Sequence, residues 1–374
     1  MILNPSRNGR IFFMRQFLFI LVAIFTLISC KGQNDLVENR MYICKEVPPL
    51  SISIDGIIDS IWTMAPWSSS FVDIEGDQKP KPYLDTKIKM LWDSAYFYIL
   101  AELEEPHVWA KLTERDDIIF YDNDFEVFID PDGDTHGYTE IEINAFNTIW
   151  DLLLTKPYRD GGNALHQYDI KGLQTAVKIK GTLNDPSDKD EGWIIEMAIP
   201  WKSFGQTTSA DWPPKKDHVW RVNFSRVQWE TQVIDNTYEK VIDEATGKPK
   251  PEMNWVWSPQ RVIAMHEPEF WGTVIFKTQE NNSEAYYADF LSEEIRQRLY
   301  EIHRKQRLYF RNNKQFKTST DSLLSVQHFV TGDQIVWDMR SDQYTYHIVM
   351  QHPHDRMLLW HLDHTGRIWR EIRE

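Results

Sequence analysis

Between about residues 52 and 276, apolar and polar residues alternate in short segments. Residues 87–92 and 96–101 flank Asp93-Ser94, a pattern that predicts a β-hairpin. The other alternating segments are 125–129, 140–144, 176–181, 193–198, 220–227 and 270–276. A period of two, punctuated by Asp, Asn, Gly and Pro, is typical of a mostly β chain that forms an antiparallel β-sandwich. Only residues 60–65 indicate a short helical turn in this part of the chain.

The pattern changes after residue 279. Five apolar residues recur at helical spacing and predict one helix: Leu291, Ile295, Leu299, Ile302 and Tyr309. Strand-like segments follow at 334–339, 344–351 and 357–369. We therefore predict a small C-terminal α+β appendage over residues 278–374, in which a helix precedes an antiparallel meander. Alternatively, the helix lies across the sandwich and makes one extended domain.

The N-terminus has the layout of a secretory signal. Arg15 precedes an apolar run at residues 17–27, which leads directly into Leu-Ile-Ser-Cys at residues 27–30. A basic residue, a short apolar run, a small residue and a cysteine are the parts of a lipoprotein signal, so Cys30 is predicted to carry lipid. The alternative is a transmembrane anchor, for which the apolar run is too short.

This signal predicts the location of the protein. Residues 1–30 are expected to be the lipoprotein signal, with Met14 as its more typical start, and residues 31–50 a polar tether. We expect palmitate or a similar lipid on Cys30. The protein is then anchored to a membrane of a Gram-negative-type cell envelope, in the periplasm or at the outer membrane.

Charge, cysteine content and tryptophan content narrow the range of ligands and structures to expect. The net charge of −15 argues against nucleic-acid partners and against binding a membrane surface by charge. Cys30 and Cys44 are the two cysteines, so no internal disulfide is expected once Cys30 is acylated. Sixteen tryptophans raise the expectation of carbohydrate binding, because an indole packs well against the apolar face of a sugar ring.

The tryptophans fall into two groups. The candidates for stacking on a sugar are Trp109, Trp150, Trp229, Trp255 and Trp257. Core positions are expected for Trp62, Trp92, Trp193 and Trp220, which occupy the apolar phase of their segments. Packing in the core or against a loop is the alternative for each stacking candidate.

Polar side chains on several strands predict a polar sheet face. Glu126, Glu140, Glu142, Asn144, Arg221 and Asn223 all occupy the polar phase. If these strands are neighbours, the face offers the donors and acceptors that sugar hydroxyls require. The alternative is an ordinary solvated face.

Two long loops, residues 155–172 and 230–253, interrupt the strand pattern. The first carries Tyr158, Arg159, His166 and Tyr168, and we expect Arg226 and His266 to face it. Tyr and His can transfer protons, and Arg can pair with the carboxylate of a uronate. Alternatively, these residues only form hydrogen bonds to a bound glycan.

A short acidic turn is the candidate metal site. Its carboxylates occupy alternate positions, Asp130, Asp132 and Asp134. Hard oxygen ligands at this spacing suit calcium, although no Glu completes an EF-hand loop. An acidic hairpin turn with Gly133 at positive φ is the alternative. No other cofactor is required.

Several motifs together resemble a known family. They are residues 124–131 (Asp-Phe-Glu-Val-Phe-Ile-Asp-Pro), 140–144, 192–201, 223–229, 254–260 and 266–272. In this order they resemble the carbohydrate-binding module family 9-like domain, in its free-standing bacterial lipoprotein form, over residues 51–277. The resemblance implies a jelly-roll-like β-sandwich, carbohydrate ligands and, as in some family members, structural calcium. The founding modules are appended to xylanases, whereas no hydrolase domain accompanies this one.

Two functions remain open. The first is a cell-envelope lipoprotein that binds oligo- or polysaccharide during glycan degradation. Its expected sugar-binding residues are Trp109, Trp150, Arg159, Trp229, Trp255, Trp257 and His266. The second is an enzyme on the same scaffold, a lyase or dehydratase that eliminates water or a glycosyl group from uronate-containing oligosaccharides. Its catalytic residues would be Tyr158, His166 and Arg226. A glycoside hydrolase is less favoured, because no pair of carboxylates stands out.

Overall fold

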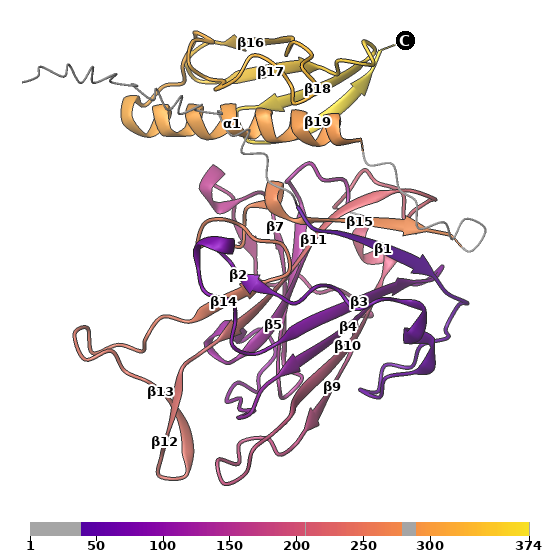
Figure 1. Ribbon diagram of the computed structural model, residues 1–374, viewed down its shortest axis with the longest axis vertical. Helices are drawn as coiled ribbons and strands as arrows, with labels where there is room; N and C mark the ends of the chain where they lie inside the picture. Colours follow the sequence, from indigo (N-terminus) through magenta and orange to yellow (C-terminus); the bar gives the residue numbers. More distant parts are fainter. Residues whose placement is uncertain (1–38, 206, 279–288, 374) are drawn as a thin grey trace, which may run out of the picture. The chain divides into compact units, whose positions relative to one another are not determined.

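The computed structural model of the chain describes residues 39–205, 207–278 and 289–373 (Figure 1). The expected signal, with Cys30, lies outside these residues. The described part is mostly β and has one α-helix, α1 (Phe290–Asn313). The strands that precede α1 are β1 (Met41–Glu46), β2 (Val72–Asp73), β3 (Thr86–Trp92), β4 (Tyr96–Glu104), β5 (Asp124–Asp130), β6 (Tyr138–Asn144), β7 (Ile149–Leu154), β8 (Ala164–Leu165), β9 (Gln174–Lys180), β10 (Gly192–Pro200), β11 (Val219–Gln228), β12 (Thr231–Ile234), β13 (Thr237–Lys240), β14 (Met253–Val256) and β15 (Gly272–Lys277). Short 3-10 helices interrupt them: η1 (Ser60–Met64), η2 (Gly76–Gln78), η3 (Ile119–Tyr121), η4 (Tyr158–Asp160), η5 (Trp201–Phe204) and η6 (Pro268–Phe270).

The main sheet curls into a sandwich-like structure. Its hydrogen-bonded order is β8-β7-β6-β5-β11-β15-β1-β3-β4-β10-β9, and β14 and β2 extend it beside β11. Ile99 of β4, Val127 of β5 and Phe276 of β15 belong to one buried cluster, so the two halves of the sheet share a core. Trp201 and Trp220 pack edge to face in this core, with ring centroids 5.4 Å apart. The predicted mostly β, sandwich-like fold is confirmed, and so is the β3–β4 hairpin.

Strand β1 differs from the prediction. It lies in the segment 31–50 that the sequence predicts to be a polar tether, and that prediction is wrong for residues 41–46. Tyr42 and Cys44 are buried, and the strand pairs in parallel with β15 and β3. Met41 before Tyr42 and Ile43 after it are also apolar, which hides the period of two. The loop predicted at 230–253 likewise contains a separate two-stranded sheet, β12–β13.

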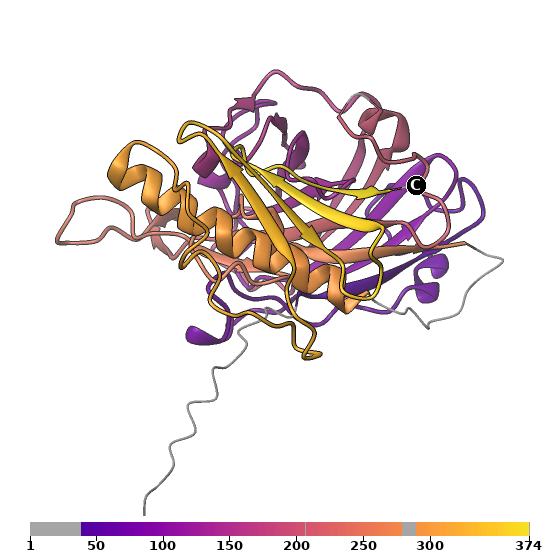
Figure 2. The same ribbon diagram turned by 90° about the horizontal axis from the view of Figure 1, so that it is seen from above.

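The C-terminal residues form a helix packed on a small sheet. Strands β16 (Trp337–Ser341), β17 (Tyr346–Gln351), β18 (Leu358–Asp363) and β19 (Ile368–Ile372) pair in that order, and Figure 2 shows them lying against α1. Asp289 caps α1 by accepting a hydrogen bond from the Ser292 N–H. Ile295 on the predicted helical face packs with Ile348 and Leu362. The helix and the antiparallel meander are confirmed, and the domain boundaries stay a prediction.

Helix α1 also forms hydrogen bonds and ion pairs with residues of η4 and β11. His303 Nε2 lies 2.8 Å from Asp160 Oδ1 of η4, and Arg221 of β11 pairs with Glu293.

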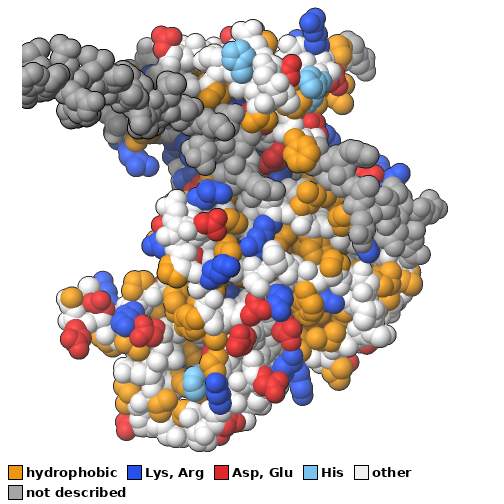
Figure 3. All heavy atoms as spheres, viewed as in Figure 1, with side chains coloured by type: hydrophobic (Ala, Val, Ile, Leu, Met, Phe, Trp, Pro, Cys, Tyr) orange, Lys and Arg blue, Asp and Glu red, His pale blue; other side chains and the backbone are white. Residues whose placement is uncertain are grey.

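None of the helices in the described ranges is both long and apolar enough to cross a membrane. Figure 3 shows acidic and basic side chains interspersed over one face, with apolar patches between them. This face therefore has no broad basic surface for a polyanion.

Candidate functional site

The centre of the candidate site is a strip of carboxyl groups on β5 and β6, next to β11. The register places Glu126 of β5 opposite Glu142 of β6 and opposite Ser225 of β11. Asp124 and Glu140 lie on the same face, because side chains two positions apart on a strand point the same way. We call Asp124, Glu126, Glu140 and Glu142 the acidic strip. It is not a solvated face, since Glu126 is 5% exposed and Glu142 is 2% exposed.

The other residues of the predicted polar face have structural partners. Asn144 and Asn223 each donate a side-chain hydrogen bond to a main-chain carbonyl at 2.8 Å. Arg221 pairs with Glu293 of α1. The strands of the predicted face are therefore neighbours, but its central polar groups are the carboxyls alone.

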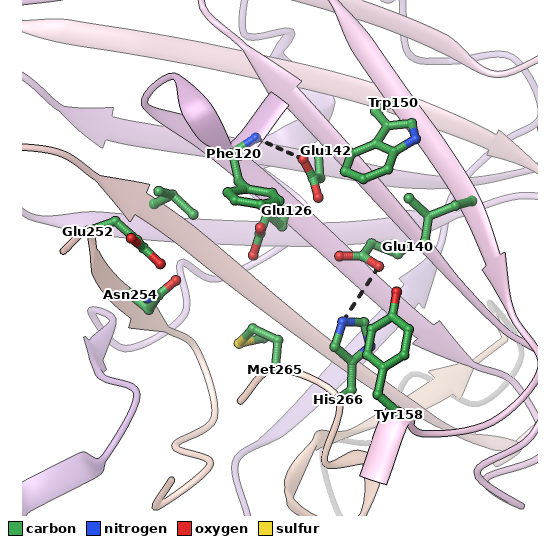
Figure 4. A pocket seen from close by; sticks show the side chains of 12 residues that line it. Phe120, Glu126, Glu140, Glu142, Trp150, Tyr158, Glu252, Asn254, Met265 and His266 are labelled. Carbon is green, nitrogen blue, oxygen red and sulfur yellow. Dashed lines mark hydrogen bonds and ion pairs between the residues drawn. The ribbon is translucent and has the colours of Figure 1, made fainter. Parts of the chain in front are cut away.

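A pocket of about 240 Å³ opens over the acidic strip (Figure 4). Its lining residues are Phe120, Glu126, Glu140, Glu142, Trp150, Leu152, Tyr158, Val227, Glu252, Asn254, Met265 and His266. They come from η3, β5, β6, β7, η4, β11, β14 and the segments before β14 and η6. Pockets for drug-sized ligands measure ~300–1,000 Å³, so this one suits a small ligand or one end of a longer ligand.

Burial controls the charge of the acidic strip. Burial, reinforced by neighbouring carboxylates, raises the pKa of Asp124, Glu140 and Glu142 well above the ordinary range. Burial also raises the pKa of Glu126 to about 7. A site of low polarity disfavours the ionised form of a carboxyl group. At neutral pH the strip therefore retains protons, and its carboxyls can both donate and accept hydrogen bonds.

His266 is a neutral donor beside this strip. Burial lowers the pKa of His266 to about 4, so its ring is uncharged at neutral pH. Burial also raises the pKa of Tyr138 well above its ordinary value, so the Tyr138 hydroxyl keeps its proton and can donate it to His266 Nδ1, 2.9 Å away. His266 Nε2 then carries the ring proton and faces Glu140 Oε2 at 3.9 Å. The half-exposed ring of Tyr158 packs edge-on against His266, with centroids 4.5 Å apart.

Trp150 forms an aromatic wall of the pocket. It is 7% exposed, and no described residue accepts a hydrogen bond from its Nε1. The exposed ring of His166 stacks on it, with centroids 5.4 Å apart and an interplanar angle of 11°. Of the residues predicted to bind or transform a sugar, the structure thus brings Trp150, Tyr158 and His266 to the pocket and His166 to the outside of Trp150.

The two predicted arginines lie elsewhere. Arg159 of η4 pairs with two glutamates, one of which is Glu269 at 2.8 Å. Arg226 is on the opposite face of β11, where its guanidinium donates to Glu105 at 3.0 Å. Neither guanidinium belongs to the pocket lining.

The remaining tryptophans are mostly core residues. The expected core positions Trp62, Trp92, Trp193 and Trp220 are all buried. The stacking candidates Trp109 and Trp229 pack in a small buried cluster, and Trp255 and Trp257 belong to the main core. Their sugar-binding role stays a prediction.

Trp255 also belongs to a second aromatic and polar cluster. The exposed ring of Tyr83 packs edge-on against it, with centroids 5.1 Å apart. The Arg226 guanidinium lies 5.2 Å from the Trp255 ring centroid. We call Tyr83, Trp255 and Arg226 the second cluster. Because Arg226 and Trp255 are buried there, it is less accessible than the pocket.

Strand β5 ends in the acidic turn, Asp130, Asp132 and Asp134. Carboxylate oxygens of the three residues lie within 4.8 Å of one another, as a calcium site requires. Most of these oxygens already accept hydrogen bonds, however. Asp130 accepts from two main-chain N–H groups at 2.9 and 2.8 Å, and Asp134 accepts from Arg367 at 2.7 Å. The turn is stable as a hydrogen-bonded structure, with Gly133 at φ +65°, and calcium at this turn stays a prediction.

Sequence reasoning missed several residues of the site. They are Asp124 of the acidic strip and Phe120, Glu252, Asn254 and Met265 of the pocket lining. Asp124 shares the polar phase of Glu126, so a signal for it is present in the sequence. Glu252 and Met265 lie in irregular segments, where no periodicity marks them.

Comparison with known proteins identifies the family. The model of the family described as "Carbohydrate family 9 binding domain-like" matches residues 54–279. Because this match spans well over half of the chain, the protein belongs to that family, as its motifs predict.

The chain is also similar to individual known proteins. It is 28% identical to endo-1,4-beta-xylanase A of Thermotoga maritima over 159 residues, which are 41% of this chain and 12% of the enzyme. It is similar to a carbohydrate binding module family 9 from Caldicellulosiruptor kristjanssonii, solved in complex with cellotriose (TM-score 0.41, 15% identity, 66% of this chain and 99% of that chain). The complex of such a module with glucose gives a TM-score of 0.40 and 16% identity, over 66% of this chain and 100% of the other.

Proposed function

We propose that this protein binds oligo- or polysaccharide and that a sugar ring enters the pocket over the acidic strip. The observation that carries the proposal is the indole of Trp150 in the wall of a pocket that also presents carboxyl and amide groups. Membership of a carbohydrate-binding family supports it.

The walls of the pocket match the two surfaces of a sugar. Trp150 and Tyr158 offer aromatic surface to the C–H face of a ring. Asn254 and the protonated carboxyls offer donors and acceptors to its hydroxyls.

The charge of the pocket favours a neutral sugar over a uronate. Its described lining includes Glu126, Glu140, Glu142 and Glu252 and no lysine or arginine. A uronate carboxylate would find no lysine or arginine of this lining to pair with, and any ionised carboxylate of the lining would repel it. We therefore propose neutral oligosaccharides as ligands of this pocket.

Calorimetric titration with glucose, cellotriose and xylotriose tests the proposal. Trp150→Ala should weaken binding roughly 10-fold or more, or about 1–3 kcal/mol by analogy with bases stacked on aromatic side chains. Trp212→Ala removes a half-exposed tryptophan outside the pocket and should leave the affinity unchanged. Near-ultraviolet circular dichroism of each variant checks its fold.

A third variant, Tyr83→Ala, tests the competing location. Loss of sugar binding in Tyr83→Ala, with full binding in Trp150→Ala, would contradict the pocket and assign the ligand to the second cluster. Full binding in Tyr83→Ala, with loss in Trp150→Ala, supports the pocket.

A second candidate function is catalysis on the bound sugar. It is favoured by one observation, the neutral His266 beside the buried Glu140, because general acid–base catalysis needs such groups next to the substrate. Under this hypothesis Glu140→Gln abolishes turnover and retains binding. Mass spectrometry of neutral and uronate oligosaccharides after incubation would show a loss of one water for elimination and a gain of one water for hydrolysis. If neither mass change is found with any sugar of the panel, the protein is not an enzyme acting on these sugars.

We also propose that the protein is a lipoprotein of the cell envelope that captures glycans during their degradation. The support is the apolar run followed by Leu-Ile-Ser-Cys at residues 27–30. Cys30→Ala should move the protein from the membrane fraction to the soluble fraction without changing its melting temperature. A variant that still pellets with membranes contradicts the lipid anchor.

A further inference from the structure

Three carboxylates of the acidic strip lie unusually close together. Oxygen atoms of Asp124, Glu126 and Glu142 are all within 4.8 Å of one another. Glu126 and Glu142 are directly opposite on adjacent strands. Like charges in that position destabilise a sheet, so the arrangement requires a compensating positive charge or protons.

The side chains of the described residues do not supply that compensation. Asp124 Oδ2 and Glu126 Oε2 are buried and accept no hydrogen bond from the described residues. Within the same ranges no lysine or arginine forms an ion pair with Asp124, Glu126 or Glu142. Buried polar atoms in proteins are nearly always paired, so the two unpaired carboxylate oxygens of this cluster indicate a missing ligand.

We propose that Asp124, Glu126 and Glu142 bind one hard divalent cation, calcium by preference, at the edge of the sugar pocket. Figure 4 shows the carboxylates of Glu126 and Glu142 close together inside the pocket. A cation there neutralises the like charges of the strip and pairs the two free oxygens. This site is distinct from the acidic turn at the other end of β5.

The ligand set selects the ion. Calcium takes about 6–8 oxygen ligands in a flexible geometry, whereas magnesium demands a near-ideal octahedron and usually keeps several waters. A cluster of three buried carboxylates suits the flexible coordination of calcium. A set made of carboxylates, without His or Cys, also disfavours zinc.

Three carboxylates leave coordination positions of calcium unfilled. Because Glu126 and Glu142 line the pocket, those positions face the space where a sugar would bind. Sugar hydroxyls are hard oxygen ligands and can complete the coordination. This bridging role rests on the proposed sugar binding, whereas the cation site itself does not.

Calorimetric titration of calcium chloride into the full chain, freed of metal with a chelator, tests the site. We expect saturable binding and a rise in melting temperature with calcium, because an ion that binds only the folded state stabilises it. Glu126→Gln, which has the same size without the charge, should weaken binding at least 10-fold and remove most of the rise. Asp132→Asn in the acidic turn is the matched control and should retain both.

Three results would overturn the assignment. The first is an absence of calcium binding to the wild type at millimolar concentration. The second is binding that Asp132→Asn loses and Glu126→Gln keeps, which would assign the ion to the acidic turn. The third is tighter binding of magnesium than of calcium, which would refute the choice of ion. A native near-ultraviolet circular dichroism spectrum of Glu126→Gln ensures that a loss of binding is not a loss of fold.

The bridging role is tested by titrating cellotriose with calcium and with chelator. Tighter sugar binding in calcium, lost in Glu126→Gln, supports the bridge. Equal sugar binding in both conditions overturns it. Calcium binding without any sugar binding supports the cation site and contradicts the proposed function, so the two failures are distinguishable.

Discussion

The two ends of strand β5 each carry a cluster of three carboxylates, and the two clusters are built in opposite ways. At the C-terminal end of β5, hydrogen bonds hold the acidic turn. Asp130 accepts from two main-chain N–H groups, and Asp132 accepts from Thr208 and Ser209. One oxygen of the turn, Asp132 Oδ1, lacks a partner. At the start of β5, Asp124 and Glu126 each have an unpaired buried oxygen, and no lysine or arginine among the described residues forms an ion pair with either.

The difference shows that the number of carboxylates does not determine the role of an acidic cluster. The donors around it do. A carboxylate whose oxygens accept main-chain N–H groups fixes the shape of the backbone, as Asp130 does. A carboxylate with a buried and unpaired oxygen, such as Glu126, must hold a proton or bind a ligand.

Removal of Asp130 should have the largest effect on stability. Asp130→Ala leaves two main-chain N–H groups of the turn unpaired in a buried position, and each such loss costs about 1–3 kcal/mol. We expect the free energy of unfolding in urea to fall by about 2–4 kcal/mol. Asp132→Ala, in the half-exposed part of the turn, is the control and should cost about 1 kcal/mol. Equal losses in both variants would contradict the structural role of Asp130.

Substitution of Glu126, in contrast, should raise the free energy of unfolding at high pH. Burial raises the pKa of Glu126 from 4.5 to about 7, so the folded state holds its proton more tightly than the unfolded state. The resulting stabilisation is fully present below about pH 4.5 and is lost as the pH rises through about 7. With chelator at about pH 8, Glu126→Gln should be more stable than the wild type by about 1–3 kcal/mol, and at about pH 4.5 nearly equal to it.

Urea unfolding over a series of pH values measures this difference. Glu114→Gln, a substitution at an exposed site, controls for the chemical change itself. Stability curves of Glu126→Gln and the wild type that run parallel from pH 4.5 to 8 would show that Glu126 is not a buried titrating group.

Loss of Arg367 should have the smallest effect. Arg367 Nε lies 2.7 Å from Asp134 Oδ2, but its side chain is half exposed, and such pairs contribute about 0.2–1 kcal/mol. Arg367→Ala should therefore lower the free energy of unfolding by less than about 1 kcal/mol, and Arg367→Lys should recover part of it. A loss as large as that of Asp130→Ala would mean that charge pairing, rather than main-chain hydrogen bonds, holds the acidic turn.

Most of the fold could be predicted because its strands have one buried face. In β5, Val127 and Ile129 point into the core and alternate with residues of the other face, so a period of two is visible. The helix was equally clear, because Ile295, Leu299 and Ile302 recur at helical spacing and are all buried. Strand β1 was missed because apolar residues occupy both of its faces, and periodicity needs a contrast between faces.

The site was only partly predictable for a related reason. The polar phase correctly placed Glu126, Glu140 and Glu142 on one face, but alternation cannot distinguish a covered polar face from a solvated one. Phe120 of the 3-10 helix η3 and Met265 of the irregular segment before η6 help to cover this face. No local pattern indicates where such segments fold back, so the burial and the raised pKa values of the carboxyls followed only from the structure.

The position of β1 has a consequence for the synthesis of the protein. Residue 41 of β1 pairs with residue 273 of β15, so one neighbour of the first strand is translated only after most of the chain. Contacts between residues so far apart in sequence slow folding. Until β15 is made, β1 presents an unpaired strand edge, which is a template for pairing with other chains. Chains that are truncated before β15 should therefore aggregate or require a chaperone, even though nearly all of the sandwich sequence is present.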